Sequence, residues 1–144
     1  MSRIEEALSN FGNDFNCAQS VFGAFAPHYG LDVDKALKIS SGFGGGMGRS
    51  GRTCGAVTGA YMVIGLKNGM GISKDKEAKD KTYQIINEFS NHFQKKYGSM
   101  MCKEILGCDI TTPEGIAYFT QNELLEKKCS QCVKSAAEIL EEIL

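Results

Sequence analysis

The sequence predicts an all-α fold, a compact bundle of roughly six to eight helices with one glycine-rich loop. Apolar residues recur at intervals of three and four along most of the chain, as they do on the buried face of a helix. Capping residues and glycines separate these stretches, and no segment reads as β-rich. The length of 144 residues and the hydrophobic content of 42% suit a single domain over residues 1–144 with one core.

Three helices are expected before the glycine-rich loop. One runs from a Ser2–Glu5 capping box to Gly12, one is capped by Asn13 or Asp14 and ended by Pro27, and Asp34 starts a short third. After the loop, Thr53 is expected to cap a helix from Cys54 to about Leu66, and Ser73 to cap the longest helix, closed by Gly98. The last three helices are expected from Ser99 to Leu106, from Thr112-Pro113 onward and from Cys132 to Leu144.

Charge and hydropathy exclude several classes of partner. A net charge of −1 argues against nucleic acid or an acidic membrane surface, because both attract a basic excess. No apolar run approaches the roughly 20 residues of a membrane span, and the first residues carry two glutamates, unlike a secretory signal. We therefore expect a cytoplasmic protein. The sequence does not identify a redox partner protein, and a homodimer is compatible with it.

The stretch SGFGGGMGRSGRTCGAVTG, from residue 41, contains two literal matches to nucleotide-binding motifs. Gly46–Gly51 fits GxGxxG, and Gly46–Thr53 differs from a Walker A motif by having Arg52 in place of lysine. Both motifs follow a parallel strand, whereas the preceding DVDKALKISS is helical in character. We therefore expect no nucleotide binding. The glycines instead predict a tight, close-packed path, and Gly55 and Gly59 would let another backbone approach the next helix.

Cysteine is unusually frequent, with six residues in a chain expected in a reducing compartment, where metal or redox chemistry is commoner than a disulfide framework. Four of them fall at predicted helix starts: Cys17, Cys54, Cys102 and Cys129. A helix N-terminus favours a negative group and can lower a thiol pKa from about 8.5 to roughly 3.5–7.5. Thiolates bind metals and attack disulfides. Four helix starts could converge on one anionic object, such as an iron–sulfur cluster.

A second set of four cysteines is an alternative choice for the metal or redox site. Cys102 and Cys108, with Cys129 and Cys132, resemble a loosely spaced zinc site, and Cys129-Ser-Gln-Cys132 alone is a CxxC redox pair. Neither histidine, His28 or His92, is expected to be a ligand. Arg49 and Arg52 either offset the charge of an anionic site or are solvated, and for Arg52 the first role is favoured.

Four segments carry a resemblance that covers nearly the whole chain: FNCAQSVFGAF from residue 15, the glycine-rich stretch through KNG at 69, CKEILGCD from 102 and CSQCVKSAAEILEEIL from 129. The chain resembles a family of redox-active proteins named for the cysteine pattern C-GCAxxG-C-C. The family cysteines fall on Cys17, Cys54, Cys102 and Cys129, with Gly55 and Gly59 beside Cys54. Cys108 and Cys132 lie outside that set and are kept as substitute ligands. Split-Soret cytochromes carry a similar module thought to hold an iron–sulfur cluster.

The resemblance and the cysteine placement together predict a redox-active protein with a four-cysteine site. Its cofactor is expected to be a [2Fe–2S] cluster used in electron transfer or redox sensing. Two alternatives remain open at this point, a metal-free thiol–disulfide oxidoreductase and a zinc-stabilised interaction module. The sequence assigns no catalytic residue, so the chain could be an oxidoreductase or an electron-transfer component.

Overall fold

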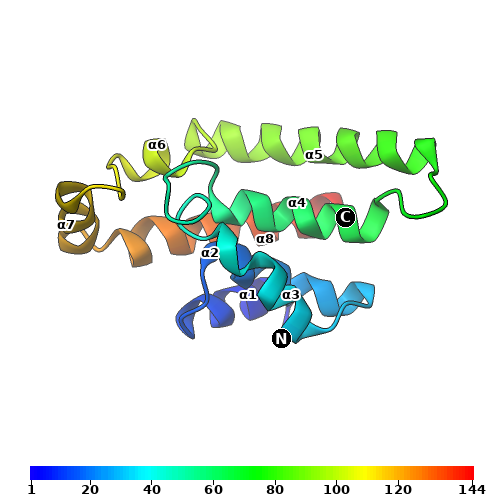
Figure 1. Cartoon of the computed structure of the whole chain (residues 1–144), viewed down its shortest axis with the longest axis horizontal. Coiled ribbons are helices and arrows are strands. Elements are labelled where there is room, and N and C mark those ends of the chain that lie inside the picture. Colours follow the sequence, from blue (N-terminus) through cyan, green and yellow to red (C-terminus); the bar gives the residue numbers. More distant parts are fainter.

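The computed structural model describes residues 1–144 and confirms the all-α prediction, with eight α-helices and no strand (Figure 1). The α-helices are α1 (Arg3–Gly12), α2 (Cys17–Phe25), α3 (Val33–Ser40), α4 (Gly55–Asn68), α5 (Lys76–Tyr97), α6 (Cys102–Leu106), α7 (Pro113–Gln121) and α8 (Ser130–Ile143). Two 3-10 turns, Ala26–Tyr29 and Ser41–Phe43, follow α2 and α3, and a π-helical segment, Leu125–Cys129, runs directly into α8. No helix has the combination of length and hydropathy needed to cross a bilayer.

The start of α2 differs from the prediction because a better cap lies further along the chain. Asn16, and not Asn13 or Asp14, is the N-cap: its side chain accepts from the Gln19 N–H at 2.9 Å, and the Gln19 side chain accepts from the Asn16 N–H at 3.1 Å. This reciprocal box satisfies two backbone donors at once. Asp14 lies in a left-handed turn before it, with φ of 71°. The correction places Cys17 at the first position of α2.

Two other helices also begin at an aspartate that the prediction passed over. Asp32, not Asp34, caps α3 by accepting from the Lys35 N–H. Asp75, not Ser73, caps α5 by accepting from the first-turn N–H groups. A carboxylate is an effective cap because it is both an acceptor and a negative charge at the positive end of the helix.

The main core lies where α2 meets α1, α3, α4 and α8, with α5 packed across α4 and α8 (Figure 1). Its largest fully buried side chains include Phe25, Ile64, Phe89, Phe93 and Leu140. Phe89 and Phe93 of α5 stack with ring centroids 6.0 Å apart. The core therefore fixes the relative positions of α2, α4 and α8, which carry most of the cysteines.

A second, smaller hydrophobic cluster lies at one end of the molecule, around α6 and α7. It buries Cys102, Leu106 and Leu124, and partly buried side chains pack on it, including those of Cys108 and Cys129. Cys54 and Cys132 belong to the main core instead. The cysteines thus gather at the boundary between the two clusters.

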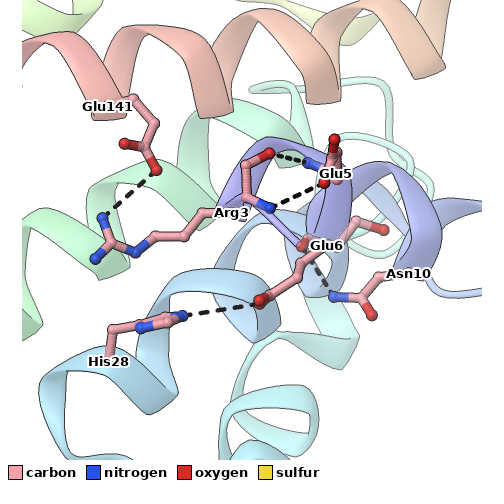
Figure 2. Close-up of polar contacts among 8 residues, drawn as sticks. Arg3, Glu5, Glu6, Asn10, His28 and Glu141 are labelled. Atoms are coloured by element: carbon pink, nitrogen blue, oxygen red, sulfur yellow. Dashed lines mark hydrogen bonds and ion pairs between the residues drawn. The ribbon is translucent and has the colours of Figure 1, made fainter.

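The first helix, α1, is joined to α8 and to the 3-10 turn after α2 by ion pairs that Figure 2 shows. Arg3 Nη1 lies 3.4 Å from Glu141 Oε1 of α8, and the guanidinium lies over the Phe25 ring at 5.7 Å. His28 Nε2 lies 3.8 Å from Glu6 Oε2 at the surface, so this histidine belongs to the contacts of α1. His92 is exposed on α5. Neither histidine lines the cavity that holds the cysteines.

Candidate functional site

The glycine-rich loop contains a left-handed helical turn. Five consecutive residues, 45–49, have positive φ between 59° and 71°, and two of them, Met47 and Arg49, are not glycine. An L-residue in this conformation is disfavoured by roughly 1–2 kcal/mol, which explains why glycine fills the other three positions. Gly46 is also the most tightly packed of them, since a Cβ there would lie 2.5 Å from the Arg52 nitrogen.

The backbone N–H groups of the same turn are already used within the loop. The N–H groups of residues 47–52 all donate to carbonyls of the loop itself, at 2.8–3.3 Å. A phosphate-binding loop needs such N–H groups free to point at the ligand. The segment before the loop is α3 followed by a 3-10 turn, with no strand. Both observations support the prediction that the GxGxxG and Walker-like matches are coincidental.

The end of the loop joins the starts of α4 and α6. An isolated antiparallel bridge pairs Thr53 with Met101, so Thr53 does not cap α4. Around it, the Cys54 N–H donates to Met100 O at 2.8 Å, and the Cys102 N–H donates to Arg52 O at 2.6 Å. Cys54 becomes the N-cap of α4, and Cys102 the first residue of α6. This pairing places two predicted site cysteines next to each other.

Gly55 and Gly59 let another backbone approach α4 closely, as the sequence predicted, and the approaching helix, α2, begins at Cys17. A Cβ on Gly59 would lie 2.8 Å from the Ala18 carbonyl oxygen, and one on Gly55 would lie 3.1 Å from the Cys17 Cβ. Helices α2 and α4 are therefore in backbone contact at these two glycines. Because Cys17 is the first residue of α2, this contact sets it beside Cys54.

Cys129 immediately precedes α8, as predicted, but the chain is already helical there. Cys129 does not begin a free helix: its φ and ψ of −62° and −43° are helical, and it ends the π-helical segment that continues into α8. Cys132 lies three residues later, in the first turn of α8. Residues three apart share a helix face, so both sulfurs can reach the same side.

Five of the six cysteines line one cavity of about 740 Å³. They come from α2, the start of α4, α6 and the α8 region: Cys17, Cys54, Cys102, Cys129 and Cys132. Cys108 does not line it. No three His, Cys, Asp or Glu side chains are arranged to hold a single metal ion. The structure thus brings together the four predicted site cysteines, adds Cys132 and leaves Cys108 outside.

Cys54 has the most acidic environment of these thiols. The Cys132 thiol is in hydrogen-bonding contact with its sulfur, which lowers the pKa of Cys54, and the N–H groups of Ala56 and Val57 lower that pKa further, against the opposing effect of burial. The same contact raises the pKa of Cys132 far above the usual range for a thiol, with burial adding to it. Of this pair at the start of α4, Cys54 is therefore the thiol that loses its proton more readily.

Two other cysteines at helix starts have raised pKa values, where the sequence predicted lowered ones. Contact with Cys129 is the main cause that raises the pKa of Cys17, followed by burial and the neighbouring sulfurs. Burial raises the pKa of Cys102 to about 12, and the charge on Cys54 adds to the shift. The expected lowering fails because burial and crowding with other sulfurs outweigh the helix dipole.

The cysteine positions match those of one protein family. The profile of a family described as "Putative redox-active protein (C_GCAxxG_C_C)" matches residues 15–143, which include all six cysteines. The chain belongs to this family. Searches of curated proteins and of solved structures gave no match.

Two features of this C_GCAxxG_C_C protein were not found by sequence reasoning, and the choice between the two arginines was wrong. Arg49 lines the cavity, whereas Arg52, the residue favoured as a counter-charge, is exposed outside it. The Tyr97 hydroxyl lies beside Cys132 and contacts Ser135 Oγ at 2.6 Å. Apolar side chains from the α6–α7 end, including Ile110 and Phe119, line the same cavity as the thiols. Only Arg49 carried a signal in the sequence, its place in the glycine-rich loop.

The buried thiols of this C_GCAxxG_C_C protein predict a stability that falls at high pH in the reduced, metal-free state. The folded-state pKa of Cys102 is about 12, against 9.0 as the ordinary value, so between these pH values the unfolded chain loses a proton that the folded chain keeps. Folding free energy should therefore be lost as pH rises from 9.0 towards 12, by at most about 1.4 kcal/mol per pH unit from this group.

Urea unfolding at a series of pH values measures this effect. Cys102→Ser should flatten the decline relative to the wild-type chain, while Cys108→Ser should flatten it less, because the raised pKa of Cys108 belongs to a more exposed thiol outside the cavity. A stability profile of Cys102→Ser that superimposes on that of the wild type would contradict the assignment.

Proposed function

We propose that this chain is a redox protein in which Cys17, Cys54, Cys102 and Cys129 bind an iron–sulfur cluster of the [2Fe–2S] type, used in electron transfer or redox sensing. One observation carries the proposal: thiols from four separate elements converge on one cavity, and all four ligand positions line it. Four thiolates are the usual ligand set of such a cluster.

The chemistry of the cavity fits a sulfur-ligated group. No histidine lines it, and its only charged residues are Asp14 and Arg49. A bound cluster would accept and release one electron, at a potential set by burial, hydrogen bonds to sulfur and nearby charge. The residues that set those conditions here are the Ala56 and Val57 N–H groups beside Cys54, and the glycine-rich loop that forms part of the cavity wall.

Specific observations bear on the two alternatives. The contacts of Cys54 with Cys132 and of Cys17 with Cys129 favour metal-free thiol–disulfide chemistry as the second candidate. The zinc-stabilised interaction module, built on Cys102, Cys108, Cys129 and Cys132, is less supported because Cys108 lies outside the cavity that holds the other three.

The test is to purify the full chain without oxygen, record its visible spectrum and assay iron, zinc and acid-labile sulfide together. A brown protein with equal amounts of iron and sulfide is the expected result. Cys54→Ser should lose the colour, and Cys108→Ser should keep it. A colourless protein with stoichiometric zinc would favour the interaction module, and a colourless, metal-free protein with reversibly oxidised thiols would favour the thiol enzyme.

A further inference from the structure

The cavity that holds the thiols has a second group of lining residues, which are apolar. They come from α6, from α7 and from the segments on either side of α7: Ile105, Leu106, Ile110, Ile116, Phe119 and Leu125. Helices α6 and α7 form one end of the molecule (Figure 1). These side chains carry no atom that binds a metal, so a cluster held by the thiols would bond to none of them.

Two of the apolar side chains are about half-exposed although they line the cavity. Ile116 is 52% exposed and Leu125 is 46% exposed. Ile116 and Phe119 are three residues apart on α7, so they share one helix face, and that face lines the cavity. Exposed apolar side chains that gather around a hollow are typical of a binding site, because a ligand that covers them removes their surface from water.

The size and the charge of the cavity limit the class of ligand. Its volume of about 740 Å³ lies within the range of roughly 300–1,000 Å³ that is usual for small organic ligands. Its two charged lining residues, Asp14 and Arg49, have opposite signs, and none of the ion pairs in the structure includes either of them. The lining therefore offers no net charge to offset the hydration that an ionic ligand would lose.

We propose that this cavity binds a small, uncharged aromatic molecule against Ile116, Phe119 and Leu125. The aromatic class follows from three phenylalanines that line the cavity, Phe11, Phe15 and Phe119, because aromatic rings gain from edge-to-face and offset contacts with other rings. This binding goes beyond the proposed function and does not rest on it, since the apolar side chains contact the ligand whether or not the thiols hold a cluster.

The test is equilibrium dialysis of the full chain, purified without oxygen, against 2-naphthol, an aromatic molecule that is uncharged at neutral pH. A dissociation constant of about 10–100 μM is expected. 2-Naphthalenesulfonate has the same ring system with a negative charge, and it should bind about tenfold more weakly because its charge loses water on entering the cavity. Iron and acid-labile sulfide are assayed in the same samples.

Ile116→Asn and Leu125→Asn test the contribution of the apolar side chains. Because both residues are about half-exposed, the main core stays intact, and each variant should bind naphthol about fivefold more weakly through the loss of an apolar contact. Ile39→Asn is the matched control, since Ile39 is 54% exposed on α3 and does not line the cavity. Its naphthol binding should equal that of the wild-type chain. Circular dichroism of the three variants checks that the helices are retained.

Several results would overturn the proposal: no naphthol binding at about 1 mM, tighter binding of the sulfonate, or equal weakening by Ile39→Asn. A wild-type dimer that Ile116→Asn and Leu125→Asn convert to monomers, with naphthol binding unchanged, would also overturn it, because a second copy would then cover these side chains. The iron assay separates the two proposals. Naphthol binding to an iron-free chain supports the ligand site and contradicts the cluster, whereas iron and sulfide without naphthol binding do the reverse.

Discussion

Gly59→Val is expected to lower the free energy of unfolding by about 3 kcal/mol and to disrupt the cysteine site before the helices are lost. Even a single Cβ would lie 2.8 Å from the Ala18 carbonyl oxygen, a backbone atom that cannot rotate away. Helices α2 and α4 must therefore separate. Cys17 begins α2, so the separation draws its sulfur away from Cys54. Urea unfolding, circular dichroism and iron content, measured on one preparation, check the three parts of this prediction.

Gly65, in the same helix α4, offers a matched control for the substitution of Gly59. A Cβ on Gly65 would meet nothing within 4 Å, so Gly65→Ala should stabilise α4 by about 0.5–1 kcal/mol through helix propensity alone. If Gly59→Val kept its cysteine site and its stability, the backbone contact between α2 and α4 would not be what positions Cys17.

Gly46→Ala is expected to have the largest effect among single-methyl substitutions in the loop, at about 3 kcal/mol or more. Its φ of +71° disfavours any L-residue, and its Cβ would lie 2.5 Å from the Arg52 nitrogen and 2.8 Å from the Arg52 oxygen. Arg52 is the residue whose carbonyl accepts from the Cys102 N–H, so the disturbance should reach the cavity directly. Thermal and urea unfolding of the reduced chain measure the loss.

Substitutions at two neighbouring glycines separate the effect of backbone strain from the effect of close contact. Gly48 has φ of +61° but open space around it, so Gly48→Ala should cost only about 1 kcal/mol from backbone strain. Gly42 has neither a positive φ nor an atom within 4 Å, so Gly42→Ala should change stability by less than about 0.5 kcal/mol. If alanine at Gly46, Gly48 and Gly42 changed the stability equally, the left-handed turn would not be what positions Arg52 and Cys102.

Much of the fold could be predicted because the signals were local. Apolar residues at intervals of three and four predicted the helices, and Gly12 and Gly98 mark helix ends as expected. The errors lay at helix starts, where several acceptors compete within a few residues. At α2 the outcome was decided by Gln19, which returns a hydrogen bond to Asn16, and neither Asn13 nor Asp14 had such a partner.

The sequence predicted which four cysteines lie together, but it did not predict the contacts among them. Helix starts and family resemblance both selected Cys17, Cys54, Cys102 and Cys129, and all four line the cavity. The role of Cys132 could not be read from the sequence, because it depends on how the π-helical segment sets the rotation of α8 about its axis. The bridge between Thr53 and Met101 joins residues far apart in the chain, so no local pattern predicts it.

Cys17 and Cys129 lie near opposite ends of the chain. A link between them therefore changes the conformational entropy of the unfolded chain. Any bond that joins these two sulfurs, directly or through a shared metal centre, closes a loop of roughly 100 residues, for which loop-closure theory assigns an unfolded-state penalty of about 4–5 kcal/mol. The same bond would tie the second helix to the last and cross the boundary between the two hydrophobic clusters. A change in the oxidation or occupancy of this site is therefore also a change in how readily the whole chain unfolds.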